Sequence, residues 1–199
     1  GIAYVELRSL DVNAFDPHGI NSEQLHFLEV FMLFCLLEES PVLSQSEISA
    51  IDENLLLVAH QGRKPGLDLR RGEEKISLQD WATELCNKMK GVAKLLDLAN
   101  YCENYFSSVK SQLASVFDPE LTPSARMLAE MEENGEGFFH HAQRMSEHHC
   151  RYYKNHPLPD SKIRYFEQLA KQSLEKQKQI ESENSISFDE FLENYFKQA

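Results

Sequence analysis

The strongest constraint in this sequence is a succession of segments with helical periodicity that fills the chain from residue 21 onward. Several of them begin at a side chain that caps helices, such as Asn21 with Gln24 three residues later, or Ser44 with Glu47. Gly62 is typical of a helix end. The pattern predicts helices at about residues 21–39, 44–62, 77–96, 101–116, 122–135, 138–155, 161–183 and 187–197.

The first ten residues have a different pattern. Between Gly1 and Leu10, β-branched and aromatic side chains alternate with period two, as in a β-strand. A lone strand cannot satisfy its own backbone, and no second strand is evident in the rest of the sequence. We therefore expect a mainly α, bundle-like fold with one N-terminal strand whose sheet partners lie upstream. The expected organisation is one region, residues 1–199, with a strand and turn over 1–15 and helices over 21–199.

Apolar spacing also predicts which helix faces form the core. Each of the first four helices carries apolar side chains at intervals of three or four residues. The expected core residues are Leu25, Leu28, Phe31, Met32 and Cys35 in the first helix, with Phe27, Phe34 and Leu36 widening its apolar face, Ile48, Ile51, Leu55, Val58 and Ala59 in the second, Trp81, Leu85, Met89, Val92 and Leu96 in the third, and Tyr105, Val109 and Leu113 in the fourth.

Charge and apolar content narrow the range of partners. The sequence has 20 Lys and Arg against 32 Asp and Glu, a net charge of −12, and residues 1–60 hold one base and ten acids. A chain this acidic repels nucleic acid and anionic membrane surfaces, so we exclude both as main partners. The longest apolar run, residues 30–37, is too short to span a bilayer, and the sequence does not open like a secretory leader.

The four cysteines are widely spaced and form no C-x-x-C pair. Cys35 and Cys86 fall inside helical patterns, and Cys102 and Cys150 lie far from each other. This spacing favours reduced thiols over a disulfide framework, and with it a cytoplasmic location.

Glu6 and Arg8 are the strongest candidates for a chemical role. Residues two apart on a strand share a face and lie about 6.5–7 Å apart. A carboxylate there suits Mg²⁺, which keeps one or two protein carboxylates beside substrate phosphates. A neighbouring guanidinium suits phosphate oxygens. The alternative is an ordinary ion pair on an exposed face, and two residues alone favour that alternative.

Two other groups of residues suggest sites more weakly. The loop after Gly62, which reads GRKPG and continues to two arginines, lacks the spacing of a Walker A loop. A helix C-terminus explains it better than an anion site. The pairs His140-His141 and His148-His149 lie about 10–12 Å apart along one helix, too far for a single ion, so we expect surface or partly buried histidines.

The segment Tyr4–Asp11, which reads YVELRSLD, resembles the Y-[IV]-E-[VL]-R-S-L-D strand of the proteobacterial-type glutamate–cysteine ligases, or gamma-glutamylcysteine synthetases. Three further blocks, at Phe27–Cys35, Gly62–Leu67 and Leu121–Leu128, resemble the family in the same order and spacing. Four blocks in register are far more specific than one. The resemblance covers almost the whole chain but only the C-terminal part of a family member, and it is looser from about Phe138 onward.

The resemblance implies a function. Family members use ATP to phosphorylate the side-chain carboxylate of L-glutamate, and the amine of L-cysteine then attacks this gamma-glutamyl phosphate to give gamma-glutamylcysteine, the first step of glutathione biosynthesis. The site lies on a curved antiparallel sheet similar to that of glutamine synthetase, to which residues 1–10 would belong. In this sequence Glu6 would be a Mg²⁺ ligand near ATP, and Arg8 would contact the transferring phosphoryl group, which is a catalytic and nucleotide-binding role.

Two departures from the family qualify this expectation. The family commonly has Asn-Pro-Phe where this sequence has Asn13-Ala14-Phe15. The other metal-binding carboxylates, most of the sheet and the cysteine-binding residues belong to the family's N-terminal part. We therefore expect no turnover from this piece alone. Without neighbouring strands, we expect residues 1–10 to be poorly ordered or to pair with another copy, because open strand edges recruit strands. The competing hypothesis is a non-catalytic helical interaction module derived from the family, and a carboxylate-rich sheet encoded upstream would argue against it.

Overall fold

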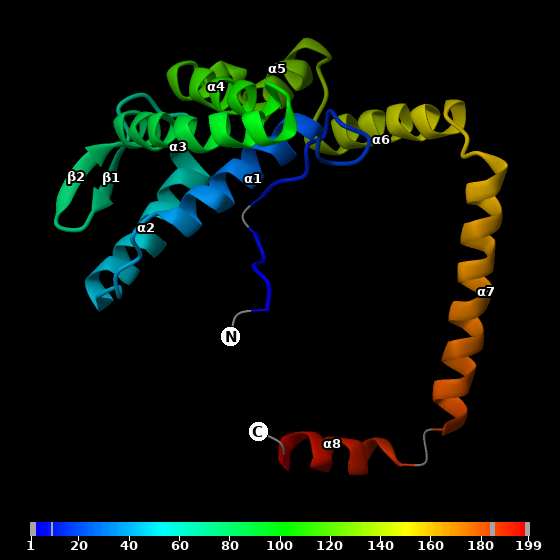
Figure 1. Ribbon diagram of the computed structural model, residues 1–199. Helices are drawn as coiled ribbons and strands as arrows, with labels where there is room; N and C mark the ends of the chain where they lie inside the picture. The colour runs from blue at the N-terminus through cyan, green and yellow to red at the C-terminus, as the bar shows by residue number, and fades with distance from the viewer. Residues whose placement is uncertain (1–2, 9, 184–185, 198–199) are drawn as a thin grey trace. The chain divides into compact units, whose positions relative to one another are not determined.

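A computed structural model of the chain describes residues 3–8, 10–183 and 186–197, and they are mainly helical, as the sequence predicts (Figure 1). Contacts group the chain into two compact units, residues 1–150 and 151–199. The elements within the described residues are α1 (Ser22–Leu37), α2 (Gln45–Gln61), β1 (Asp68–Arg71), β2 (Glu74–Ser77), α3 (Leu78–Asn100), α4 (Asn104–Phe117), the 3-10 turn η1 (Pro119–Leu121), α5 (Pro123–Glu133), α6 (Phe138–Asn155), α7 (Asp160–Glu183) and α8 (Phe188–Lys197).

Most helices begin where their capping side chains predict. In α1 the Asn21 side chain accepts the Gln24 N–H at 2.8 Å, and the Gln24 side chain accepts the Asn21 N–H at 3.0 Å. Ser44 and Glu47 form the same reciprocal capping box at the start of α2. Such caps satisfy backbone donors that the helix itself leaves unpaired. The local sequence is therefore sufficient to place these helix starts.

The start of α4 depends instead on the preceding helix. Glu103, at the N-cap position, makes no capping hydrogen bond with its side chain. The carboxylate of Asp97 in α3 accepts the backbone N–H groups of Tyr105 and Phe106, each at 2.9 Å. Because this cap comes from another helix, α4 begins at Asn104, three residues later than its own pattern predicts.

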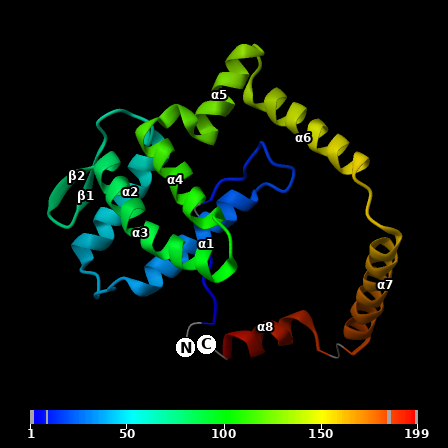
Figure 2. The ribbon, with the colours of Figure 1, turned by 45° about the horizontal axis from the view of Figure 1, so that its top comes forward.

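The core of the first unit lies between α1, α3 and α4, which pack side by side in the two views of Figure 1 and Figure 2. Tyr105 contributes its ring to this core and its hydroxyl donates to Glu29 at 2.9 Å, which raises the pKa of Tyr105. The buried residues of the cluster are Val30, Phe34, Cys86, Met89, Val92, Ala93, Tyr105 and Val109.

The predicted core faces of α3 and α4 are confirmed, that of α1 is confirmed in part, since Phe27, Phe31 and Phe34 belong to the core, and that of α2 is wrong. α1 buries Val30 and Phe34, while the predicted Met32 is 42% exposed. α1 is apolar around most of its circumference, so periodicity does not select one face. α2 buries Ala50 and leaves the predicted Leu55 59% exposed, because its contacts are with the hairpin rather than with the helical core.

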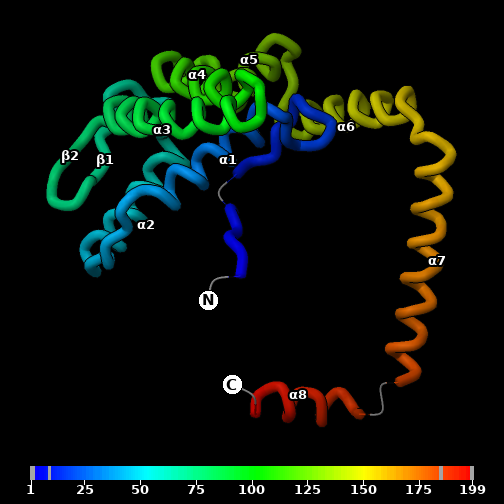
Figure 3. The backbone as a smooth tube through the Cα atoms, in the orientation of Figure 1, coloured from blue at the N-terminus to red at the C-terminus, as the bar shows by residue number. Residues whose placement is uncertain are grey.

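A two-stranded antiparallel hairpin follows α2, where the sequence was interpreted as a loop without strands (Figure 3). Leu69 pairs with Ile76 across the strands and is buried. Gly72 has φ +62°, which suits the first central position of a two-residue type II′ turn. Asn54 of α2 donates to the Arg70 carbonyl at 2.7 Å and accepts the Arg70 N–H at 2.9 Å. Its side chain thus makes the two backbone hydrogen bonds that a residue of a neighbouring strand would make.

The predicted N-terminal strand is not formed. Residues 3–8 and 10 adopt no regular secondary structure, and Gly1, Ile2 and Ser9 lie outside the described residues. An extended segment becomes a strand only when a neighbour completes its hydrogen bonds. The hairpin is the one sheet among the described residues, and residues 3–8 do not pair with it.

The second unit holds the end of α6 together with α7 and α8. Apolar side chains such as Phe166, Leu169 and Phe191 are about half exposed there. Among the described residues, no helix combines the length and the apolar character that crossing a bilayer requires. All four cysteines are free thiols, as the sequence predicts, and burial raises the pKa of Cys86.

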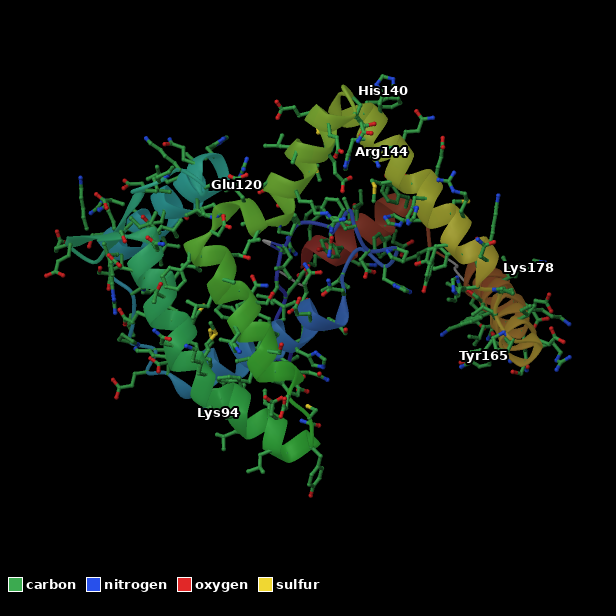
Figure 4. The ribbon with its side chains drawn as sticks, turned by 90° about the horizontal axis from the view of Figure 1, so that it is seen from above. Lys94, Glu120, His140, Arg144, Tyr165 and Lys178 are labelled. Carbon is green, nitrogen blue, oxygen red and sulfur yellow. The ribbon has the colours of Figure 1, made fainter. Side chains whose placement is uncertain are left out.

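Ion pairs connect α5 to α6. Arg144, labelled in Figure 4, donates to the carboxylate of Glu136 at 2.6 Å and to that of Glu130 at 3.3 Å. The hydrogen bond from Arg144 holds the pKa of Glu136 below its ordinary value of 4.5. A carboxyl group with a lowered pKa stabilises the folded state above its ordinary pKa and loses that effect as the pH falls through the lowered value.

Replacing Asp97 with alanine should destabilise the first unit. Two backbone N–H groups at the start of α4 lose their acceptor, and we expect a cost of about 1–2 kcal/mol. Urea unfolding followed by the fluorescence of Trp81, the one tryptophan of the sequence, measures it. Asp52→Ala, at an exposed position of α2, is the matched control and should change stability by less than about 0.5 kcal/mol. Equal effects of the two substitutions would contradict the assigned cap.

Replacing Arg144 with glutamine should raise the pKa of Glu136 toward its ordinary value. The variant should then lack the stability that the pair contributes above the ordinary pKa of Glu136. It should also lack the loss of that stability as the pH falls through the lowered pKa. NMR titration of the Glu136 side-chain carboxyl carbon measures the change, and Arg164→Gln, at an exposed site on α7, should leave it unaltered. An unchanged Glu136 titration in the Arg144 variant would contradict the pairing.

Candidate functional site

Glu6 and Arg8 lie together on an exposed segment. Nη2 of Arg8 is 2.9 Å from Oε2 of Glu6, and the two side chains are 82% and 52% exposed respectively. This is the geometry of the ordinary ion pair that the sequence left open. Exposed ion pairs add little stability, so the fold itself does not require these two residues.

A closed loop, residues 13–19, joins this segment to α1. The backbone N–H of Asn13 donates to the Gly19 carbonyl at 2.8 Å, and its side-chain oxygen accepts the Phe15 N–H at 3.0 Å. Its side-chain nitrogen donates at 2.9 Å to the carboxamide of Gln24, which also belongs to the capping box of α1. The buried Asn13 therefore ties the loop to the start of the first core helix.

Two histidines of α6, His141 and His149, contact this loop. Nε2 of His149 is 2.8 Å from the carbonyl oxygen of Ala14. His141 is buried, with Nε2 3.5 Å from a Glu130 carboxylate oxygen. Within the part of the chain that the structure describes, no group of three or more His, Cys, Asp or Glu side chains could hold a metal ion.

The loop from Gly62 to Leu67 connects α2 to the hairpin. Gly62 is the C-cap of α2 and donates to the Val58 carbonyl at 2.9 Å, as the helix-terminus interpretation predicts. Arg63 lies 3.7 Å from Glu120, and Lys64 donates to Gln61 at 3.3 Å. These basic side chains are thus engaged by groups of the same chain.

The donor set at residues 6–8 suits one part of a metal–nucleotide site. A carboxylate supplies an oxygen of the kind that Mg²⁺ binds, and waters and phosphates complete the shell of that ion. The adjacent guanidinium is a forked donor for phosphate oxygens. Glu6 and Arg8 could therefore hold one edge of a metal-bound triphosphate.

The pattern of the sequence did not reveal the contacts that hold the loop. The guanidinium carbon of Arg126 lies 3.7 Å from the centre of the Phe15 ring, and the His141 ring meets the same ring edge-on. Arg126 belongs to the block Leu121–Leu128 that resembles the family. The block was visible in the sequence, but its contact with a residue more than a hundred positions earlier was not.

Comparison with known proteins gives a consistent result. A family model described as glutamate-cysteine ligase matches residues 1–58, which include Glu6 and Arg8. Similar curated proteins include the glutamate–cysteine ligases of Pseudomonas savastanoi pv. phaseolicola and Pseudomonas paraeruginosa. Each is 42% identical to this chain, over 196 and 195 residues respectively, which is 98% of this chain and 37% of the relative.

A solved structure extends the similarity to the fold. The glutamate–cysteine ligase of Francisella tularensis, in complex with AMP, aligns with a TM-score of 0.85 and 28% identity over 94% of this chain and 36% of that one. The chain thus spans little more than a third of the length of the proteins that it matches. In sequence and in fold, the chain is homologous to part of a bacterial glutamate–cysteine ligase of the Pseudomonas type.

Proposed function

We propose that this chain is part of an enzyme that ligates the side-chain carboxylate of L-glutamate to L-cysteine at the expense of ATP. The observation that carries the proposal is the exposed Glu6–Arg8 pair, which lies inside the region matched by the family model. The AMP bound by the Francisella relative supports an adenine nucleotide as substrate. The product is gamma-glutamylcysteine, which is the first intermediate of glutathione biosynthesis.

In this proposal Glu6 and Arg8 act on the phosphates. Glu6 would provide a carboxylate oxygen to Mg²⁺, which offsets the charge of the triphosphate. Arg8 would keep a fixed positive charge beside the phosphoryl group as it moves from ATP to the glutamate carboxylate. The cysteine amine then attacks the acyl carbon, the new amide bond forms and phosphate leaves. The Glu6–Arg8 hydrogen bond would hold both groups side by side until the nucleotide binds.

Exposed apolar faces support the proposal that the chain acts within a larger enzyme. Leu36 and Leu37 of α1 and Leu55 and Leu56 of α2 are each more than half exposed. Pairs of adjacent, exposed leucines on two helices are the kind of apolar surface that contact with other protein would cover. The remainder of the ligase would cover these faces and would supply the other metal ligands, the neighbouring strands for residues 1–10 and the cysteine site.

In the complete ligase, Glu6→Gln and Arg8→Ala should each lower kcat while the fold is retained. Loss of a charge that stabilises the transition state costs about 10²–10³-fold in comparable sites. A coupled assay of ADP release with glutamate and cysteine measures it. Glu53→Gln is the matched control, because Glu53 is a similarly exposed carboxylate paired with Arg70 at 3.1 Å. Near-normal turnover in either the Glu6 or the Arg8 variant would refute the role assigned to that residue.

The isolated 199-residue chain should not turn over and should bind Mg-ATP weakly. Glu6 and Arg8 would form only one edge of the site, and catalysis needs all its groups held together. Isothermal titration calorimetry with Mg-ATP tests the binding, and a micromolar dissociation constant would contradict the expectation. Sedimentation velocity on the same sample tests the proposed self-association through residues 3–8, whose backbone lacks a strand partner among the described residues.

A further inference from the structure

The loop of residues 13–19 determines how the segment bearing Glu6 and Arg8 leaves the folded unit. Residues 3–8 form no regular secondary structure, so the first fixed point after them is this loop. Asn13 closes it against Gly19, where a φ of +73° lets the chain turn back. A rotation of the loop would therefore shift the point at which this segment joins the folded unit.

Arg126 of α5 holds one side of this loop. Its guanidinium lies over the Phe15 ring at 3.7 Å from the ring centre, and its Nε also donates to Glu130 at 3.4 Å. A guanidinium stacked on an aromatic face combines electrostatic attraction with planar contact. The ring is enclosed further by the buried His141, whose centroid lies 6.4 Å away.

His149 of α6 holds the adjacent residue. Nε2 of His149 lies 2.8 Å from the carbonyl oxygen of Ala14. A carbonyl oxygen only accepts hydrogen bonds, so the proton of this contact is on Nε2. The other ring nitrogen, Nδ1, is buried and has no hydrogen-bond partner among the described residues. The hydrogen bond to the loop is thus the single polar contact that fixes the orientation of this ring within that part of the chain.

We infer that His149 and Arg126 are positioning residues, which hold loop 13–19 from two helices far along the sequence and so orient Glu6 and Arg8. The effect on turnover rests on the proposed ligase function, whereas the anchoring of the loop does not. Neither side chain needs to touch substrate, because both act through Ala14 and Phe15. The two anchors come from α5 and α6 and contact neighbouring residues, so together they restrain rotation of the loop as well as its displacement.

The first test is kinetic and uses three variants of the complete ligase. His149→Ala removes the donor, whereas His149→Gln keeps a side-chain N–H at a similar reach. His148→Ala is the matched control, because His148 is the exposed neighbour on the same helix. We expect His149→Ala to lower kcat about 3- to 10-fold with little change in KM for ATP, and His149→Gln to restore most of it. A merely structural role would reduce the yield of folded enzyme without this rescue.

The second test is hydrogen exchange in the same proteins, which requires no activity. His149→Ala should speed exchange several-fold at the amides of residues 13–19, while His148→Ala and His149→Gln should not. Arg126→Lys, which keeps the charge but loses the planar stacking on Phe15, should speed exchange at the same amides. Unchanged exchange in His149→Ala and Arg126→Lys would overturn the inference. Altered exchange in a protein without ligase activity would instead retain the anchoring and reject the proposed function.

Discussion

The packing of α1 against α3 and α4 is the contact on which the rest of the first unit depends. It encloses Val30, Ala93 and Val109 completely, and burial of a valine side chain contributes about 1.5–3 kcal/mol. This packing also brings the end of α3 close enough to α4 for Asp97 to cap it. Because α1 is fixed in this way, its N-terminus is a fixed attachment point for loop 13–19.

The capping box of α1 extends this rigidity to the candidate site. Gln24 accepts the Asn21 N–H as part of the box and the Asn13 side chain at the same carboxamide oxygen. Loop 13–19 is thus joined to the core helix on one side and to α5 and α6 on the other. Residues 3–8 extend from that loop with Glu6 and Arg8 exposed and adjacent. The fold supplies the support, and the proposed chemistry belongs to two side chains that the fold does not need.

Local sequence predicts this fold well where the determining contacts are local. Capping pairs such as Ser44 with Glu47 place the helix starts because donor and acceptor lie within one turn. The hairpin was missed because two four-residue strands with charged side chains give a weak pattern, although Gly72 was a readable turn signal. The N-terminal strand was predicted with sheet partners upstream, and residues 3–8, which have no strand neighbour among the described residues, adopt no regular secondary structure.

For the candidate site, the sequence alone suggested that Glu6 and Arg8 suit a metal–nucleotide site. It could not suggest the contacts that hold loop 13–19, since Phe15 and Arg126 meet only after folding. A crystal structure of the complete protein with Mg²⁺ and a non-hydrolysable ATP analogue tests most directly whether Glu6 and Arg8 hold the nucleotide. We expect a Glu6 oxygen about 2.0–2.1 Å from the metal and the Arg8 guanidinium in hydrogen-bond contact with a phosphate oxygen. A metal ligated without Glu6, with Arg8 still paired only to that carboxylate, would contradict this expectation.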